Sequence, residues 1–142
     1  MRDEGNVPFV LDASIATSWA LSDEHEAAAT AALKRADSDS CVVPALWWFE
    51  IRNAMLMAER RKRLTSSDTA SFLRELADLR IMEDFSPEEK NLLQLARAHK
   101  LTVYDATYLE LAQRRSIPLA TLDTALARAA RAEKVPIIGR VS

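Results

Sequence analysis

The amino-acid sequence predicts an α/β fold, specifically a three-layer α/β/α sandwich with a central, mostly parallel sheet of about five short strands. Short apolar segments recur along the chain without strict alternation, a pattern typical of parallel strands covered on both faces. Longer segments with helical periodicity separate them and can serve as the crossovers that parallel pairing requires. The 142 residues include only two glycines and no repeat, which indicates a single domain over residues 1–142.

Five segments are predicted as strands because each is apolar and is bounded by polar residues or proline. All of them are short, as strands of a small sheet usually are. The predicted strands cover residues 7–11, 41–43, about 80–82, 117–121 and 135–138.

Seven helices are predicted, partly from periodicity and partly from their start signals. Ser86 followed by Pro87 resembles a capping residue with proline at the first helical position. Thr65 and Asp68 have the spacing of a capping box, in which each side chain bonds the backbone of the other. The predicted helices cover about 13–20, 23–37, 45–62, 65–79, 87–99, 103–115 and 123–133.

Cysteine content and hydropathy predict a reducing, cytoplasmic setting. Cys41 is the only cysteine, so no disulfide can form within the chain. No apolar run approaches the roughly 20 residues that a membrane-spanning helix needs. The first residues also lack the pairing of a basic segment with a long apolar one that marks a secretory signal.

The net charge of −2 does not by itself indicate a nucleic-acid-binding protein. Acidic residues gathered in one metal site would nevertheless leave the remaining surface more basic, and bound cations would invert the local sign of charge. Residues 60–63 are four consecutive cations that can follow an RNA backbone or complement the end of a helix. Both interpretations of this run stay open.

Two aspartates directly follow predicted strands. Asp12 ends FVLD and Asp123 ends PLATLD, and each precedes a predicted helix. In an open parallel sheet this position faces the crevice where ligands bind. Either aspartate can instead be a helix cap, which is a common role for Asp at a strand-to-helix turn.

Two further acids fall on apolar helix faces. Glu50 lies in PALWWFEIRNAMLMA with Trp47 and Ala54 at helical spacing, and Asp105 shares its face with Tyr108. An unpaired buried charge costs several kcal/mol, so such acids normally have a cationic partner. The alternatives are a solvent-facing Glu50 and a first-turn Asp105 that complements the helix dipole.

Together these acids indicate a site for a divalent cation. Carboxylates that converge at one sheet edge repel one another unless protons or cations intervene. Hard oxygen ligands suit Mg²⁺, with Mn²⁺ as a substitute, whereas the chain has too few His and Cys residues for a usual zinc site. The predicted cluster, called the acidic quartet below, consists of Asp12, Glu50, Asp105 and Asp123.

In order along the chain, VLDAS, VPALWWFEIRNA, LTVYDATYLELA and PLATLD resemble the PIN-domain family, specifically the ribonuclease toxins of VapBC-type toxin-antitoxin pairs. The likeness spans nearly the whole chain. It implies that the acidic quartet binds metal, directly or through water. It also matches Ser14 and Thr121 to hydroxyl positions beside the quartet, and Asn53 to a residue that orients Glu50; for these three, capping or simple exposure stays open.

The resemblance further implies an activity and partners. The expected reaction is Mg²⁺-dependent endonucleolytic cleavage of RNA by a metal-activated water, which leaves a 5′-phosphate and a 3′-hydroxyl. The expected partners are the RNA substrate, a cognate antitoxin protein whose C-terminal segment wraps the toxin, and a second copy of the chain in a homodimer.

Two other functions compete with this interpretation. A haloacid-dehalogenase-like phosphohydrolase would use Asp12 as a nucleophile, but that family needs a second aspartate where this chain has Ser14. A noncatalytic module would keep the fold to bind RNA or protein, which an intact quartet disfavours. Trp47, Trp48 and Phe49 are interpreted mainly as core residues, with base stacking or partner contact as the alternative.

Overall fold

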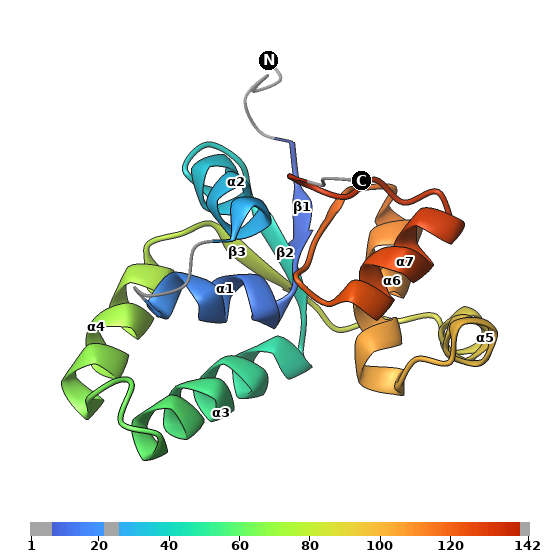
Figure 1. Cartoon of the computed structure of the whole chain (residues 1–142). Helices are drawn as coiled ribbons and strands as arrows, with labels where there is room; N and C mark the ends of the chain where they lie inside the picture. Colours follow the sequence, from blue (N-terminus) through green and yellow to red (C-terminus); the bar gives the residue numbers. More distant parts are fainter. Residues whose placement is uncertain (1–6, 22–25, 140–142) are drawn as a thin grey trace.

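The computed structural model describes residues 7–21 and 26–139. Within them, four strands form one sheet in the order β3-β2-β1-β4, with helices on both sides (Figure 1). The strands are β1 (Phe9–Leu11), β2 (Cys41–Pro44), β3 (Ile81–Asp84) and β4 (Leu119–Ala120).

All strand pairs are parallel. Phe9 pairs with Cys41 in β2, and Val10 pairs with Leu119 in β4. β3 continues the sheet beyond β2, with Cys41 opposite Ile81. Because every strand runs the same way, their carboxyl ends lie along one edge of the sheet, where residues that follow the strands are brought together. The predicted α/β class and parallel sheet are confirmed.

The predicted fifth strand at residues 135–138 is wrong. In this segment only Ile137 forms an isolated bridge, parallel to Leu119 in β4. Pro136 accepts a hydrogen bond from the Leu119 backbone but has no N–H to continue the ladder. The segment therefore lies along the edge of β4 without becoming a strand.

Five of the seven helices begin within one residue of their predicted starts, and α2 and α5 begin later. Glu26 has an extended backbone, so α2 begins at Ala27; predicted residues 23–25 lie outside the described residues. The predicted start at Ser86 and Pro87 is wrong, because Glu88 caps α5 by accepting from the Asn91 backbone. The helices are α1 (Ala13–Ala20), α2 (Ala27–Ala36), α3 (Leu46–Arg60), α4 (Ser66–Ala77), α5 (Glu89–His99), α6 (Val103–Arg115) and α7 (Thr124–Ala132).

The layers of the fold separate the helices into two groups. Figure 1 shows α1 to α4 on one side of the sheet and α5 to α7 on the other. β1 is fully buried, and Ile51 of α3 and Leu109 of α6 pack from opposite sides into the same core. None of the helices in the described part of the chain is long and apolar enough to cross a membrane.

The aromatic run at the start of α3 divides between core and surface. Trp47 is buried in the hydrophobic core, as predicted. Trp48 is 46% exposed and Phe49 is 69% exposed, so the core assignment is wrong for both. The reason is the helical period: consecutive residues point about 100° apart, and only one of the three can face the sheet.

Candidate active site

The four predicted acids come from four separate places in the chain. Asp12 directly follows β1, and Asp123 follows β4, its parallel neighbour. Glu50 lies in α3, and Asp105 lies in the first turn of α6. Electrostatic interactions couple Asp12 to Asp105, Glu50 to both of them, and Asp105 to Asp123. The structure thus brings the acidic quartet together at the carboxyl edge of the sheet.

Asp12 is buried and is held by two hydroxyl groups. Ser14 Oγ donates to Asp12 Oδ2 at 2.7 Å, and Thr121 Oγ1 donates to the same oxygen at 2.6 Å. Asp12 occupies the N-cap position of α1, but its carboxylate makes no capping hydrogen bond there. Burial, with a smaller contribution from the negative charge of Asp105, raises the pKa of Asp12 above its usual value despite the two hydroxyl donors.

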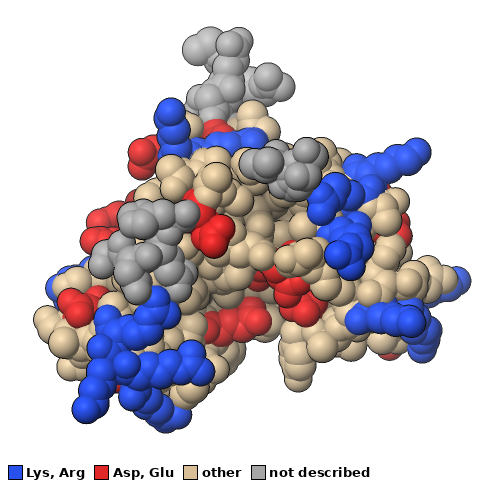
Figure 2. Space-filling model, in the orientation of Figure 1, with Lys and Arg blue, Asp and Glu red and all other residues tan. Residues whose placement is uncertain are grey.

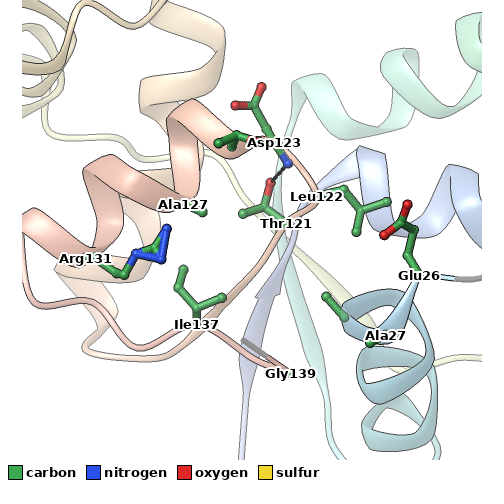
Figure 3. Close-up of a pocket in the computed structure, with 11 residues that line it drawn as sticks. Glu26, Ala27, Thr121, Leu122, Asp123, Ala127, Arg131, Ile137 and Gly139 are labelled. Carbon is green, nitrogen blue, oxygen red and sulfur yellow. Dashed lines mark hydrogen bonds between the residues drawn. The ribbon is translucent and has the colours of Figure 1, made fainter. Parts of the chain in front are cut away.

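The same two hydroxyls also accept hydrogen bonds from the backbone of the loop between β4 and α7. Ser14 Oγ also accepts from the Leu122 backbone at 2.9 Å. Thr121 Oγ1 accepts from the Asp123 backbone at 3.0 Å, the bond drawn in Figure 3. Each hydroxyl therefore donates to Asp12 and accepts from the loop between β4 and α7. This arrangement fixes the backbone of Asp123 relative to the carboxylate of Asp12.

Glu50 has a partner that sequence reasoning missed. The Tyr108 hydroxyl of α6 donates a short hydrogen bond to Glu50 Oε1. Burial, and then the charges of Asp12 and Asp105, raise the pKa of Glu50. Burial and the neighbouring negative charges also raise the pKa of Tyr108, so it remains a neutral donor. The sequence signal was present, because Tyr108 shares the helical face of Asp105.

Asp105 and Asp123 both lie at helix starts. Thr102 Oγ1 accepts from the Asp105 backbone at 3.1 Å, while the Asp105 carboxylate is half-buried. Burial and the charge of Asp123 raise the pKa of Asp105. Asp123 Oδ1 accepts from the Leu126 backbone at 2.9 Å, so Asp123 does cap α7. One of its oxygens is used by the cap, which leaves Oδ2 for another ligand.

Asn53 lies one helical turn after Glu50 on α3. Its side chain is exposed, and no hydrogen bond joins it to Glu50 in the described part of the chain. The expected role of Asn53 in orienting Glu50 stays a prediction.

The donor chemistry of the quartet fits a divalent cation, although the carboxylates do not form a ready-made cage. Among the described residues, no three Asp, Glu, His or Cys side chains are already arranged to hold a metal ion. Burial and neighbouring negative charges raise the pKa values of Asp12, Glu50 and Asp105, and all four carboxylates offer hard oxygen ligands. Such a set suits an ion that keeps several of its waters and touches only one or two carboxylates directly, as Mg²⁺ does.

A pocket of about 310 Å³ opens beside Asp123, between α2 and α7 (Figure 3). Small residues, Ala27, Ala127 and Gly139, line it, and Arg131 places a cation at one side. Thr121 lines the pocket as well and also contacts Asp12. Asp123 is therefore reachable from a hollow large enough for several waters.

A model of the PIN-domain family matches residues 9–132. The match covers most of the chain and includes the whole acidic quartet, so the chain belongs to the PIN-domain family. PIN domains are generally nucleases, which supports a hydrolase that acts on nucleic acid. No curated protein matches the sequence.

Solved structures with the same fold include PAE2754 from Pyrobaculum aerophilum, which is 25% identical with a TM-score of 0.67 over 94% of this chain and 86% of that one. FitAcB from Neisseria gonorrhoeae is 18% identical, with a TM-score of 0.54 over 92% and 96% of the two chains. FitAB bound to an IR36 DNA fragment is 17% identical, with a TM-score of 0.57 over 94% and 97%. These neighbours have the same fold as this chain.

Proposed function

We propose that this protein is a Mg²⁺-dependent endoribonuclease and the toxin of a VapBC-type toxin-antitoxin pair. The observation that carries the proposal is the convergence of four carboxylates, without a basic partner in the described structure, at the carboxyl edge of the sheet. Membership of the PIN-domain family supports a nuclease, and the acidic, oxygen-only site supports a divalent cation as its cofactor.

In the proposed reaction, four residues would hold the metal ion and three others orient these ligands. Asp12, Glu50, Asp105 and Asp123 would hold the ion, directly or through water. When bound, the ion supplies an activated water and stabilises charge on a phosphodiester. Ser14 and Thr121 orient the carboxylate of Asp12, because both donate to its Oδ2. Tyr108 orients Glu50 through its hydroxyl, and its burial and the surrounding acids raise its pKa and keep it protonated.

The test is cleavage of total cellular RNA by purified chain freed of copurifying protein, with Mg²⁺, with Mn²⁺ or with a chelator. Fragments that appear only with metal, and that carry 5′-phosphates and 3′-hydroxyls, are the expected result. Asp12→Asn should abolish the fragments, since it removes a buried ligand charge. Asp37→Asn, which changes an exposed acid at the end of α2, is the matched control and should cleave normally.

Two outcomes favour the competing functions. Folded, partner-free protein that binds RNA but cleaves none with either metal would indicate a noncatalytic binding module. Covalent trapping of Asp12 by a phosphate analogue, without RNA cleavage, would indicate a phosphohydrolase instead.

The proposed partners follow from the proposed toxin function. We expect a cognate antitoxin that inhibits cleavage, and we expect the free toxin to be a homodimer. Sedimentation of the purified chain measures the second point directly, because a monomer has a mass of 15.9 kDa. Co-expression with a protein encoded beside it, followed by the same RNA assay, tests the first.

A further inference from the structure

A second hollow borders the acidic quartet, between the first turns of α3 and α6. It has a volume of about 420 Å³. Two of the quartet acids form part of its wall, so the hollow is continuous with the candidate active site. Its lining residues are Leu46, Phe49, Glu50, Thr102, Tyr104 and Asp105.

Two aromatic rings lie open to solvent in this hollow. Phe49 is 69% exposed and Tyr104 is 65% exposed. They come from different helices, and each directly precedes a quartet acid, Glu50 or Asp105. Each helix therefore contributes one aromatic ring and one carboxylate to the lining of the hollow. Neither ring contributes to the hydrophobic core.

The charge on this face identifies the class of ligand that fits. Figure 2 shows acidic side chains on both sides of a central hollow, with Lys and Arg side chains gathered farther out on both flanks. One basic flank lies over the end of α3, where the run 60–63 is exposed; the other lies over α5 and α7, whose last turns include Arg97 and Arg131. A polyanionic strand that crosses the hollow would meet cations before and after the site.

We propose that Phe49 and Tyr104 stack against an unpaired nucleobase next to the phosphate held at the quartet, and so position the nucleic acid at the site. This inference rests on the proposed nuclease function. In a nucleic acid, one sugar separates a phosphate from its base, so a base beside the scissile phosphate lies next to Glu50 and Asp105. Aromatic rings stack on any base through its flat face, and a paired base is not free to enter.

An apolar side chain of a protein partner would fit the same rings. The observations favour the nucleobase, because the basic flanks complement a phosphate backbone on both sides of the hollow. If the rings bind a protein segment instead, removing either ring should leave RNA binding unchanged in the variants described next.

The experiment measures binding of a fluorescein-labelled, unstructured 12-nucleotide RNA by anisotropy, with Ca²⁺ in place of Mg²⁺ and with the RNA checked for integrity afterwards. Phe49→Ala and Tyr104→Ala should each weaken binding about 10-fold, which is the order measured for loss of one base-stacking ring. Phe49→Trp and Tyr104→Phe keep a ring and should bind normally. Phe85→Ala is the matched control, because Phe85 is equally exposed at 68% but does not line the hollow.

A set of RNAs with one abasic position each then locates the stacked base. Removing that base should weaken binding to the wild-type protein but cause little further loss in Phe49→Ala, since the ring and the base act as one pair. Normal metal-dependent cleavage together with unchanged affinity of both alanine variants would overturn the stacking site and leave the nuclease proposal intact. Wild-type protein that neither binds nor cleaves RNA would overturn both.

Discussion

The start and the end of α6 each adjoin a group of carboxylates, and only the group at the end has arginine partners. There, Arg114 Nη1 lies 2.9 Å from Asp84 Oδ2, and Arg114 Nε lies 2.7 Å from Glu110 Oε2. Arg115 Nε adds a third contact, at 2.8 Å from the same Asp84 oxygen. At the start of the helix, the described structure has no ion pair to Asp105 or Glu50.

The pKa values of the two groups shift in opposite directions. Hydrogen bonds from Arg114 hold the pKa of Asp84 far below its usual value. Burial and mutual repulsion raise the pKa values of Asp12, Glu50 and Asp105. The difference shows that this fold can supply a cation to a buried acid where the acid has a structural role. At the quartet it supplies none, which supports a cation taken from solution.

The largest expected effect comes from removing Arg114 at the end of α6, called the paired end below because its acids form ion pairs with arginine. Arg114→Met should lower the free energy of unfolding by about 3 kcal/mol, because it leaves Asp84 and the fully buried Glu110 without their main partner. Urea unfolding at neutral pH measures the change. Arg128→Met, at an exposed position of α7, is the control and should change stability little. A loss of less than about 1 kcal/mol in Arg114→Met would place these ion pairs with ordinary surface pairs.

The next largest effect concerns metal binding at the acidic quartet, next to the start of α6. Mn²⁺ at about 100 times its dissociation constant should stabilise the wild-type protein by about 2.7 kcal/mol through binding to the folded state alone. Thermal unfolding with and without Mn²⁺ measures this gain. Asp12→Asn should lose most of it, whereas Arg114→Met should keep it although it starts less stable. An equal gain in Asp12→Asn and wild type would mean that the ion binds elsewhere.

The smallest effect is a gain in stability on removing one crowded charge. Asp105→Asn should stabilise the metal-free protein by less than about 1 kcal/mol at pH 7, because the raised pKa shows that the charged form is disfavoured by folding. The gain should fade as the pH drops through the raised folded-state pKa to the ordinary value, where the wild-type carboxyl is neutral too. A clear loss of stability at pH 7 would instead indicate that Asp105 stabilises the start of α6.

The pH dependence of Asp84 has the opposite sign. Its folded-state pKa is lowered, so its contribution to stability is present above the ordinary pKa of an aspartate and is lost as the pH falls through the lowered value. Lowering the pH should therefore remove the stabilising contribution of Asp84 at the end of α6. It should also reduce the charge repulsion around Asp105 at the start of that helix.

The proximity of the four acids and most of the helices could be predicted because their signals are local. Thr65 and Asp68 form the predicted capping box at the start of α4, with both reciprocal hydrogen bonds present. Asp12 and Asp123 were identified by their position after apolar strands, and parallel pairing of β1 with β4 then brings their elements side by side.

The paired end of α6 could not be predicted as a whole. Glu110 and Arg114 have the spacing of neighbours on one helix, which is a readable signal. Asp84 lies 30 residues before Arg114, and nothing in its local sequence shows that β3 ends against α6. The partner of Glu50 was missed for a similar reason. The sequence places Tyr108 on the helical face of Asp105, but Tyr108 is 58 residues from Glu50, and their contact depends on the packing of α6.

The hydrogen bond from Thr121 to Asp12 joins residues 109 positions apart and has a consequence for protein synthesis. A ribosome makes Asp12 109 residues before Thr121, so the carboxylate lacks one of its two hydroxyl donors until Thr121 has been made. β4, which forms one edge of the sheet beside β1, is also made late. A growing chain therefore cannot assemble the quartet until synthesis has passed Asp123, the last of the four acids along the chain.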